Sequence, residues 1–140
     1  YEQSNSLQFM GVIAVKKQII KLVLTVMIVI AFFLLASTLY FLYEVEWKKT
    51  VIIELENTET GHSVILQEIG SPFLFGPSKV QIILENEKGE LVDEAEDYIY
   101  NDGKNLNQGN ISVIWTDTSA NVTLCGEEQE DKSLVLQYQR

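Results

Sequence analysis

The chain has 140 residues, of which 46% are hydrophobic, and this length allows one domain with an appendage. It carries 20 Asp and Glu against 10 Lys and Arg, a formal net charge of −10. Phosphate backbones and anionic lipids repel such a surface, so nucleic-acid binding is excluded as an expected function. One histidine and one cysteine are too few for the usual zinc clusters, and we expect no metal and no cofactor.

The first predicted element is a membrane-spanning helix. Residues 22–43 read LVLTVMIVIAFFLLASTLYFLY, without a charge, a glycine or a proline. A helix of this length extends roughly 33 Å, which matches a bilayer core of about 30 Å. Tyr40, Tyr43 and Trp47 gather at its C-terminal end, as aromatic residues do at a membrane interface. We therefore expect residues 22–43 to contact the lipid bilayer.

The charges beside this helix predict its orientation. Lys16, Lys17 and Lys21 precede it, whereas Glu44 and Glu46 follow it. The positive-inside rule then predicts a cytoplasmic tail at 1–20, a transmembrane helix at 21–43 and an extracytoplasmic domain at 44–140, in a single-pass cell-membrane protein.

The apolar run is also much longer than the core of a signal peptide, so we expect an uncleaved signal-anchor. Whether the first nine residues belong to the natural chain, or Met10 is its start, is left open.

Short alternating patterns predict an all-β outer domain, an antiparallel sandwich or a curled sheet. In the first of them Val51, Ile53 and Leu55 share one face and Glu54 and Glu56 the other. The stretch 91–100 is compatible with a helical turn, a strand or a loop. The expected strands are 51–56, 63–69, 79–85, 111–116, a short one around Val122 and Leu124, and one over 134–138, with turns at 57–61, 86–89 and 101–103.

The segment Gly70–Ser78, GSPFLFGPS, breaks the alternation with two prolines that cannot donate to a sheet ladder. It is therefore predicted to be a loop carrying three apolar side chains, Phe73, Leu74 and Phe75. Two interpretations remain: the side chains fold back and close the end of the sandwich, or they form an exposed apolar tip that contacts a partner or the bilayer. Together with Trp115 they are the candidate partner contacts.

Few residues suggest catalysis, and we expect a protein that is not an enzyme. His62 lies in a turn, where a solvated histidine is the ordinary interpretation, and no nucleophile-elbow sequence accompanies it. Cys125 follows Leu124 at a predicted strand end and is interpreted as a small buried hydrophobic residue. Two acidic clusters, Asp93–Asp97 and Glu127–Asp131, resemble solvated edges more than a calcium loop or a glycosidase pair.

The order of features resembles small, uncharacterised membrane-anchored proteins of Gram-positive bacteria, in families with a β-rich outer domain. The resemblance covers residues 15–140 and implies a bacterial envelope protein, without an activity or site residues. The matching blocks are the Lys-flanked anchor, GSPFLFGPSKV at 70–80, YNDG at 100–103, VIWTD at 113–117 and VTLCGEE at 122–128.

Three functions follow as hypotheses. The leading one is a non-enzymatic binding or interaction module of the bacterial cell envelope. Residues 44–140 carry 19 acidic against 7 basic residues, a net charge of −12, so a cationic peptide or basic protein is the partner that their charge suits. The alternatives are an accessory subunit assembled with other membrane proteins through residues 22–43, and a hydrolase that uses the acidic clusters.

Overall fold

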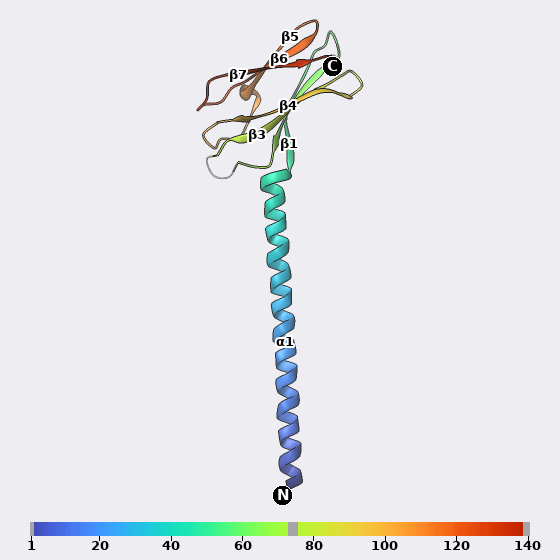
Figure 1. Ribbon diagram of the computed structural model, residues 1–140, viewed down its shortest axis with the longest axis vertical. Helices are drawn as coiled ribbons and strands as arrows, with labels where there is room; N and C mark the ends of the chain where they lie inside the picture. The colour runs from blue at the N-terminus through green and yellow to red at the C-terminus, as the bar shows by residue number, and fades with distance from the viewer. Residues whose placement is uncertain (1, 73–75, 139–140) are drawn as a thin grey trace. The chain divides into compact units, whose positions relative to one another are not determined.

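The computed structural model describes residues 2–72 and 76–138 and divides the chain into two compact units, residues 1–41 and 42–140 (Figure 1). The first unit is helical and the second contains seven β-strands. This confirms the predicted fold class, an N-terminal apolar helix followed by an all-β domain. Phe73, Leu74 and Phe75 lie outside the described residues.

The helical unit is part of one long helix, α1 (Glu2–Leu42). The stretch Val15–Trp47 is long and apolar enough to cross a membrane, and none of its most apolar window is buried by protein. Such a helix fits a membrane anchor or a signal sequence. The hydroxyls of Thr25 and Thr38 donate to the carbonyls of Lys21 and Leu34, each at 2.9 Å, within the helix itself. These two polar groups are therefore satisfied without a partner helix, and assembly through residues 22–43 stays a prediction.

The β unit begins with a π-helical turn, η1 (Tyr43–Trp47), which is fastened to the sheet. The N–H of Gly70 donates to the carbonyl of Lys48 at 2.6 Å, and the N–H of Ser71 donates to that of Val45 at 3.1 Å. Gly70 has φ +72°, and a Cβ there would lie 1.9 Å from the Val45 oxygen. Only glycine fits this contact, which explains why the chain leaves β2 through that residue.

The seven strands form two antiparallel sheets (Figure 1). The four-stranded sheet has the order β1 (Lys49–Glu56), β2 (Ser63–Ile69), β3 (Ser78–Glu85) and β4 (Leu91–Ile99). The three-stranded sheet has the order β5 (Ile111–Trp115), β6 (Ser119–Leu124) and β7 (Lys132–Gln137), and a short 3₁₀ turn, η2 (Gln108–Asn110), precedes it.

One hydrophobic core lies between the sheets, because the alternating apolar residues of both turn inward. Ile111 is buried, and the partly buried Val113 and Trp115 pack against the core. The buried members are Val64, Leu66, Val80, Ile82, Leu84, Ile99, Leu106, Ile111, Ala120, Val122, Leu124 and Leu136.

The predicted face of β1 is wrong at one residue. Val51 pairs with Gln67 and Ile53 pairs with Leu66, so Ile52 is an extra residue that forms a β-bulge. The bulge reverses the alternation on its N-terminal side. Val51 is consequently exposed, whereas Ile52 packs against the core together with Ile53 and Leu55.

The stretch left open at 91–100 is the strand β4, and its acidic residues are not simply solvated. Asp93 is buried and accepts the backbone N–H of Gln137, in β7, at 3.0 Å. Lys132, also in β7, donates to the Asp97 carboxylate at 2.7 Å and to the carbonyl of Tyr98 at 3.1 Å. The acidic side chains of β4 thus hold together the edges of the two sheets.

Candidate functional site

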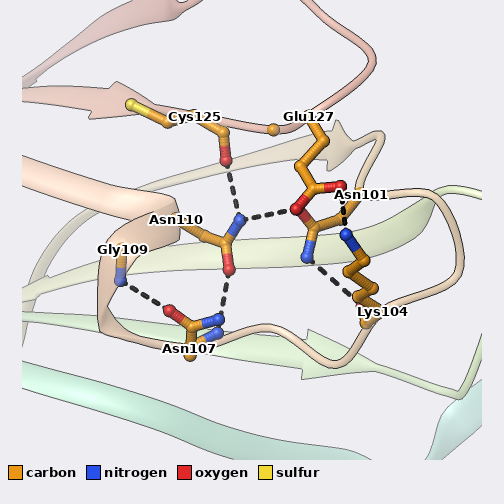
Figure 2. A pocket seen from close by; sticks show the side chains of 8 residues that line it. Asn101, Lys104, Asn107, Gly109, Asn110, Cys125 and Glu127 are labelled. Carbon is orange, nitrogen blue, oxygen red and sulfur yellow. Dashed lines mark hydrogen bonds and ion pairs between the residues drawn. The ribbon is translucent and has the colours of Figure 1, made fainter.

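The β domain has a polar cavity at each end. The first, here called the asparagine cavity, has a volume of about 350 Å³. The loop after β4, the turn η2 and the residues after β6 build it (Figure 2). Its lining residues are Asn101, Lys104, Asn107, Gly109, Asn110, Cys125, Gly126 and Glu127.

Asn110 is the centre of this cavity, and its side chain is fully used. The amide nitrogen donates to the Cys125 carbonyl at 2.9 Å and to Asn101 Oδ1 at 3.2 Å, while Oδ1 accepts the Asn107 N–H at 2.9 Å (Figure 2). Asn107 in turn caps η2 by accepting the Gly109 N–H at 2.8 Å. The network satisfies the backbone of an irregular loop, as buried polar groups require, and uses both amide hydrogens of Asn110.

The charged groups of the asparagine cavity are also paired. Lys104 forms an ion pair with Glu127, and the hydrogen bond to this carboxylate raises the pKa of Lys104. Both side chains are more than half exposed, so the pair contributes little to stability.

The only cysteine lies at this same end and is a poor nucleophile. Burial raises the pKa of the Cys125 thiol, and the neighbouring Asp131 carboxylate raises it further. A thiol with a raised pKa stays protonated at neutral pH, whereas the thiolate is the reactive form. The partly buried Cys125 therefore fits a packing role better than a catalytic one.

The second cavity, here called the tyrosine cavity, lies at the opposite end of both sheets and has a volume of about 410 Å³. It opens between the β1–β2 turn, the β5–β6 turn and the residue after β7. Its lining combines aromatic, hydroxyl, amide and carboxylate groups: Thr60, His62, Asp117, Thr118, Gln137 and Tyr138.

A stacked aromatic pair forms part of this lining. The rings of His62 and Tyr138 lie 4.3 Å apart, centre to centre, at an interplanar angle of 13°. Nδ1 of His62 also lies 3.0 Å from the Thr60 hydroxyl. His62 is half-buried, in the turn between the β1 and β2 strands, where its ring stacks on Tyr138.

The Tyr138 hydroxyl is the one polar side-chain atom in the described part of the chain that is buried without a hydrogen-bond partner. Asn57 lies near enough to lower its pKa, although no group meets hydrogen-bond geometry with it. Burial of the hydroxyl raises the pKa of Tyr138 by more than Asn57 lowers it. The negative charge of Asp117 raises this pKa further. The phenol stays neutral at physiological pH, and its oxygen keeps lone pairs that no donor among the described residues uses.

Of the predicted contact residues the structure describes only Trp115, because Phe73, Leu74 and Phe75 lie outside the described residues. Trp115 is partly buried against the core, and its role as a partner contact stays a prediction. Within residues 2–72 and 76–138, no group of three or more His, Cys, Asp or Glu side chains is arranged to hold a metal ion. His62 and Cys125 belong to opposite ends of the domain, so they do not form a catalytic pair.

Sequence reasoning missed both cavities for different reasons. The asparagine cavity had a signal, because Asn101, Asn105, Asn107 and Asn110 fall within ten residues, and it was interpreted only as a turn. The tyrosine cavity had none, because His62 and Tyr138 are far apart in the sequence and meet only when the sheets pack.

Comparison with known proteins gives no further guide. No protein-family model matches the chain, and no curated protein or solved structure matches it either. The resemblance to membrane-anchored proteins of Gram-positive bacteria therefore stays a prediction.

Proposed function

We propose that the protein is a single-pass membrane protein of a bacterial cell envelope, and that its extracytoplasmic β domain is a non-enzymatic module that binds a cationic group in the tyrosine cavity. The observation that carries this proposal is the state of the cavity's polar groups. Asp117 forms no ion pair with any described residue, and the buried Tyr138 hydroxyl has no partner. The cavity also has the size of a small-ligand site.

The chemistry of the lining supports a cation. Asp117 is the one acidic side chain of the lining, and the threonine and glutamine oxygens beside it are neutral acceptors. The rings of His62 and Tyr138 add aromatic faces, which attract ammonium groups through their quadrupoles. A primary ammonium group, such as a lysine side chain of a basic peptide, suits all of these features.

The charge of the whole domain supports the same choice. Residues 44–140 have a net charge of −12, and a field of that sign raises the local concentration of cations and speeds their association. The lysines before α1 and the glutamates after it favour the outer side of the membrane for this domain. A module placed there meets soluble basic peptides directly.

Titration calorimetry on the full-length protein in an uncharged detergent, with trilysine as the probe, tests the proposal. Because Asp117 would lie beside the bound ammonium group, we expect Asp117→Asn to weaken binding about tenfold, or about 1.4 kcal/mol. Asp102→Asn is the matched control, since it removes the same charge from an exposed turn where φ is +50°, a conformation that asparagine tolerates.

Equal losses in the two variants would mean that trilysine responds only to net charge, and the cavity would not be its site. Absence of binding at millimolar trilysine would overturn the proposed ligand class. Digestion of the β domain by protease added to intact cells tests the outer location separately, because it does not depend on a ligand.

A further inference from the structure

The two sheets have four edge strands, β1, β4, β5 and β7, and two of them are already closed. Lys132 of β7 bonds to Asp97 and to the carbonyl of Tyr98, and the N–H of Gln137 bonds to Asp93. These contacts join β4 to β7 through side chains. Neither strand therefore presents a clear edge to another chain.

The edge strand β1 is protected in a different way. It contains the bulge at Ile52, which interrupts a regular ladder, and it bears Lys49, Glu54 and Glu56 on exposed positions. Bulges and charged side chains are the features with which natural proteins prevent edge-to-edge pairing.

The edge strand β5 has none of these protections. Its sequence, ISVIW, contains no charge and no proline, and its register with β6 runs without a bulge from Ile111 to Trp115. Ile114 is 67% exposed on the outer face of the sheet, beside the exposed Ser112. An uncharged, β-branched edge of this kind is a template for another strand.

The register fixes which backbone groups of β5 are free. Cys125 N–H bonds to the Asn110 carbonyl and Thr116 N–H bonds to the Ser119 carbonyl, each at 2.9 Å, at the two ends of the β5–β6 pair. Because hydrogen-bonded pairs alternate in an antiparallel ladder, the even-numbered residues face β6. The N–H and C=O groups of Ile111, Val113 and Trp115 therefore point away from β6, and no described residue outside that ladder bonds to them.

We infer that β5 pairs with β5 of a second copy of this chain, antiparallel and centred on Val113. In this register Val113 lies opposite Val113, and Ile111 lies opposite Trp115 of the other copy. Every outward N–H and C=O group of the strand then meets a complementary group, because the free residues are symmetric about the centre. The two three-stranded sheets become one continuous sheet with a two-fold axis.

Charge and location favour a second copy as the occupant. The strand contains no ionisable side chain, so this pairing sets no like charges directly opposite each other. The apolar helix confines copies to one membrane and raises their effective concentration. The net charge of −12 on residues 44–140 opposes close approach, so we expect association to increase as salt screens the two domains.

Directed disulfide formation in native membranes tests the geometry, in the full-length chain with Cys125→Ser as background. In the inferred pair, Ser112 of one copy lies opposite Ile114 of the other, at a close non-hydrogen-bonded position. Two differently tagged chains, Ser112→Cys and Ile114→Cys, are expected to form a mixed-tag dimer in preference to either homodimer. Chains with Ser133→Cys and Val135→Cys, exposed on β7 of the same sheet, are the matched control and are expected not to cross-link.

Proline at Val113 tests the hydrogen bonds. The Val113 N–H points outward, so Val113→Pro preserves the β6 ladder and is expected to fold while losing the cross-link. If it does not fold, the exposed double change Ser112→Asp with Ile114→Asp replaces it, with molar mass in mild detergent as the readout and a monomer as the expected result. A folded Val113→Pro chain that still cross-links, a double variant that stays dimeric, equal cross-linking in the β7 control, or adducts of Ser112→Cys only with other proteins would each overturn the inference.

Discussion

The two ends of the β domain hold polar cavities of similar volume that differ in how their groups are satisfied. At the asparagine cavity, Asn110 makes three side-chain hydrogen bonds and Lys104 is paired with Glu127. At the tyrosine cavity, the Tyr138 hydroxyl is buried without a partner and Asp117 has no ion pair among the described residues. The two cavities are similar in volume, but their hydrogen bonds differ: the asparagine cavity is a satisfied structural network, whereas the tyrosine cavity keeps unpaired polar groups and is the candidate binding site.

The largest effect is expected where η1 meets the sheet, at the asparagine end. A Cβ at Gly70 would lie 1.9 Å from the Val45 oxygen at a φ of +72°. Gly70→Ala is expected to lower the free energy of unfolding by about 3 kcal/mol or more. Gly89→Ala is the matched control: its φ is +74°, but the nearest atom is 3.9 Å away, so it should cost only about 1 kcal/mol. Equal costs in denaturant titrations would show that the contact with Val45 can relax.

Removing the central amide should produce the next largest effect. Asn110→Ala leaves the Asn107 N–H and the Cys125 carbonyl without their partner, at a cost of about 2–3 kcal/mol. Asn105→Ala, at an exposed position of the same loop, should be close to neutral. If both variants melt like the wild type, the asparagine network is not structural and the contrast between the two ends fails.

The contact of Asp97 in β4 with Lys132 in β7 predicts that the stability of the domain depends on pH. Burial would raise the pKa of Asp97, but the Lys132 ammonium and the Tyr98 N–H outweigh it, so the pKa lies below its ordinary value. The stabilisation that ionised Asp97 provides is therefore complete above about pH 5. It is lost as the pH falls below about 4 and through the folded-state pKa of Asp97.

Asp97→Asn should lower the free energy of unfolding by about 1 kcal/mol or less at neutral pH, because both partners are partly exposed. It should also reduce the loss of stability between about pH 5 and pH 3.5. Glu96→Gln is the control, since the Lys79–Glu96 pair is more exposed and should contribute less. Unfolding curves at pH 7, 5 and 3.5 measure both. If Asp97→Asn loses as much stability as the wild type between about pH 5 and pH 3.5, Asp97 is not the source of the pH dependence.

The smallest expected change in the free energy of unfolding is an increase, at Tyr138. Tyr138→Phe removes a buried hydroxyl that has no hydrogen bond, so it should be neutral or stabilising by up to about 1 kcal/mol. Tyr100→Phe, whose ring is exposed, is the control and should leave stability unchanged. Clear destabilisation by Tyr138→Phe would mean that Asn57 or a bound water satisfies the hydroxyl, and the tyrosine cavity would lose its distinguishing feature.

The helix and most strands could be predicted because their signals are local. The uncharged run at 22–43 and the alternation at 63–69 and 79–85 depend only on neighbouring residues. The strand β4 was left open because two of its inward positions hold Asp93 and Asp97, which satisfy themselves with groups of β7. The bulge at Ile52 could not be seen either, since it depends on which residues of β2 lie opposite.

The candidate sites were harder to predict than the fold. Asn110 meets Cys125, and His62 meets Tyr138, only after the two sheets have paired and packed. Neither pair has a spacing that marks it in the sequence. The charge of the domain, in contrast, follows directly from the sequence. It is the reason why we propose a cationic ligand for the tyrosine cavity.

The fastening of η1 also has a mechanical consequence. Gly70 and Ser71 bind the carbonyls of Lys48 and Val45, so the chain enters the sheet without a slack segment after Tyr43. A pulling force on the N-terminal side would meet these two hydrogen bonds before it reached the ladder between β1 and β2. Under such a force, these two hydrogen bonds would have to break before β1 could separate from β2.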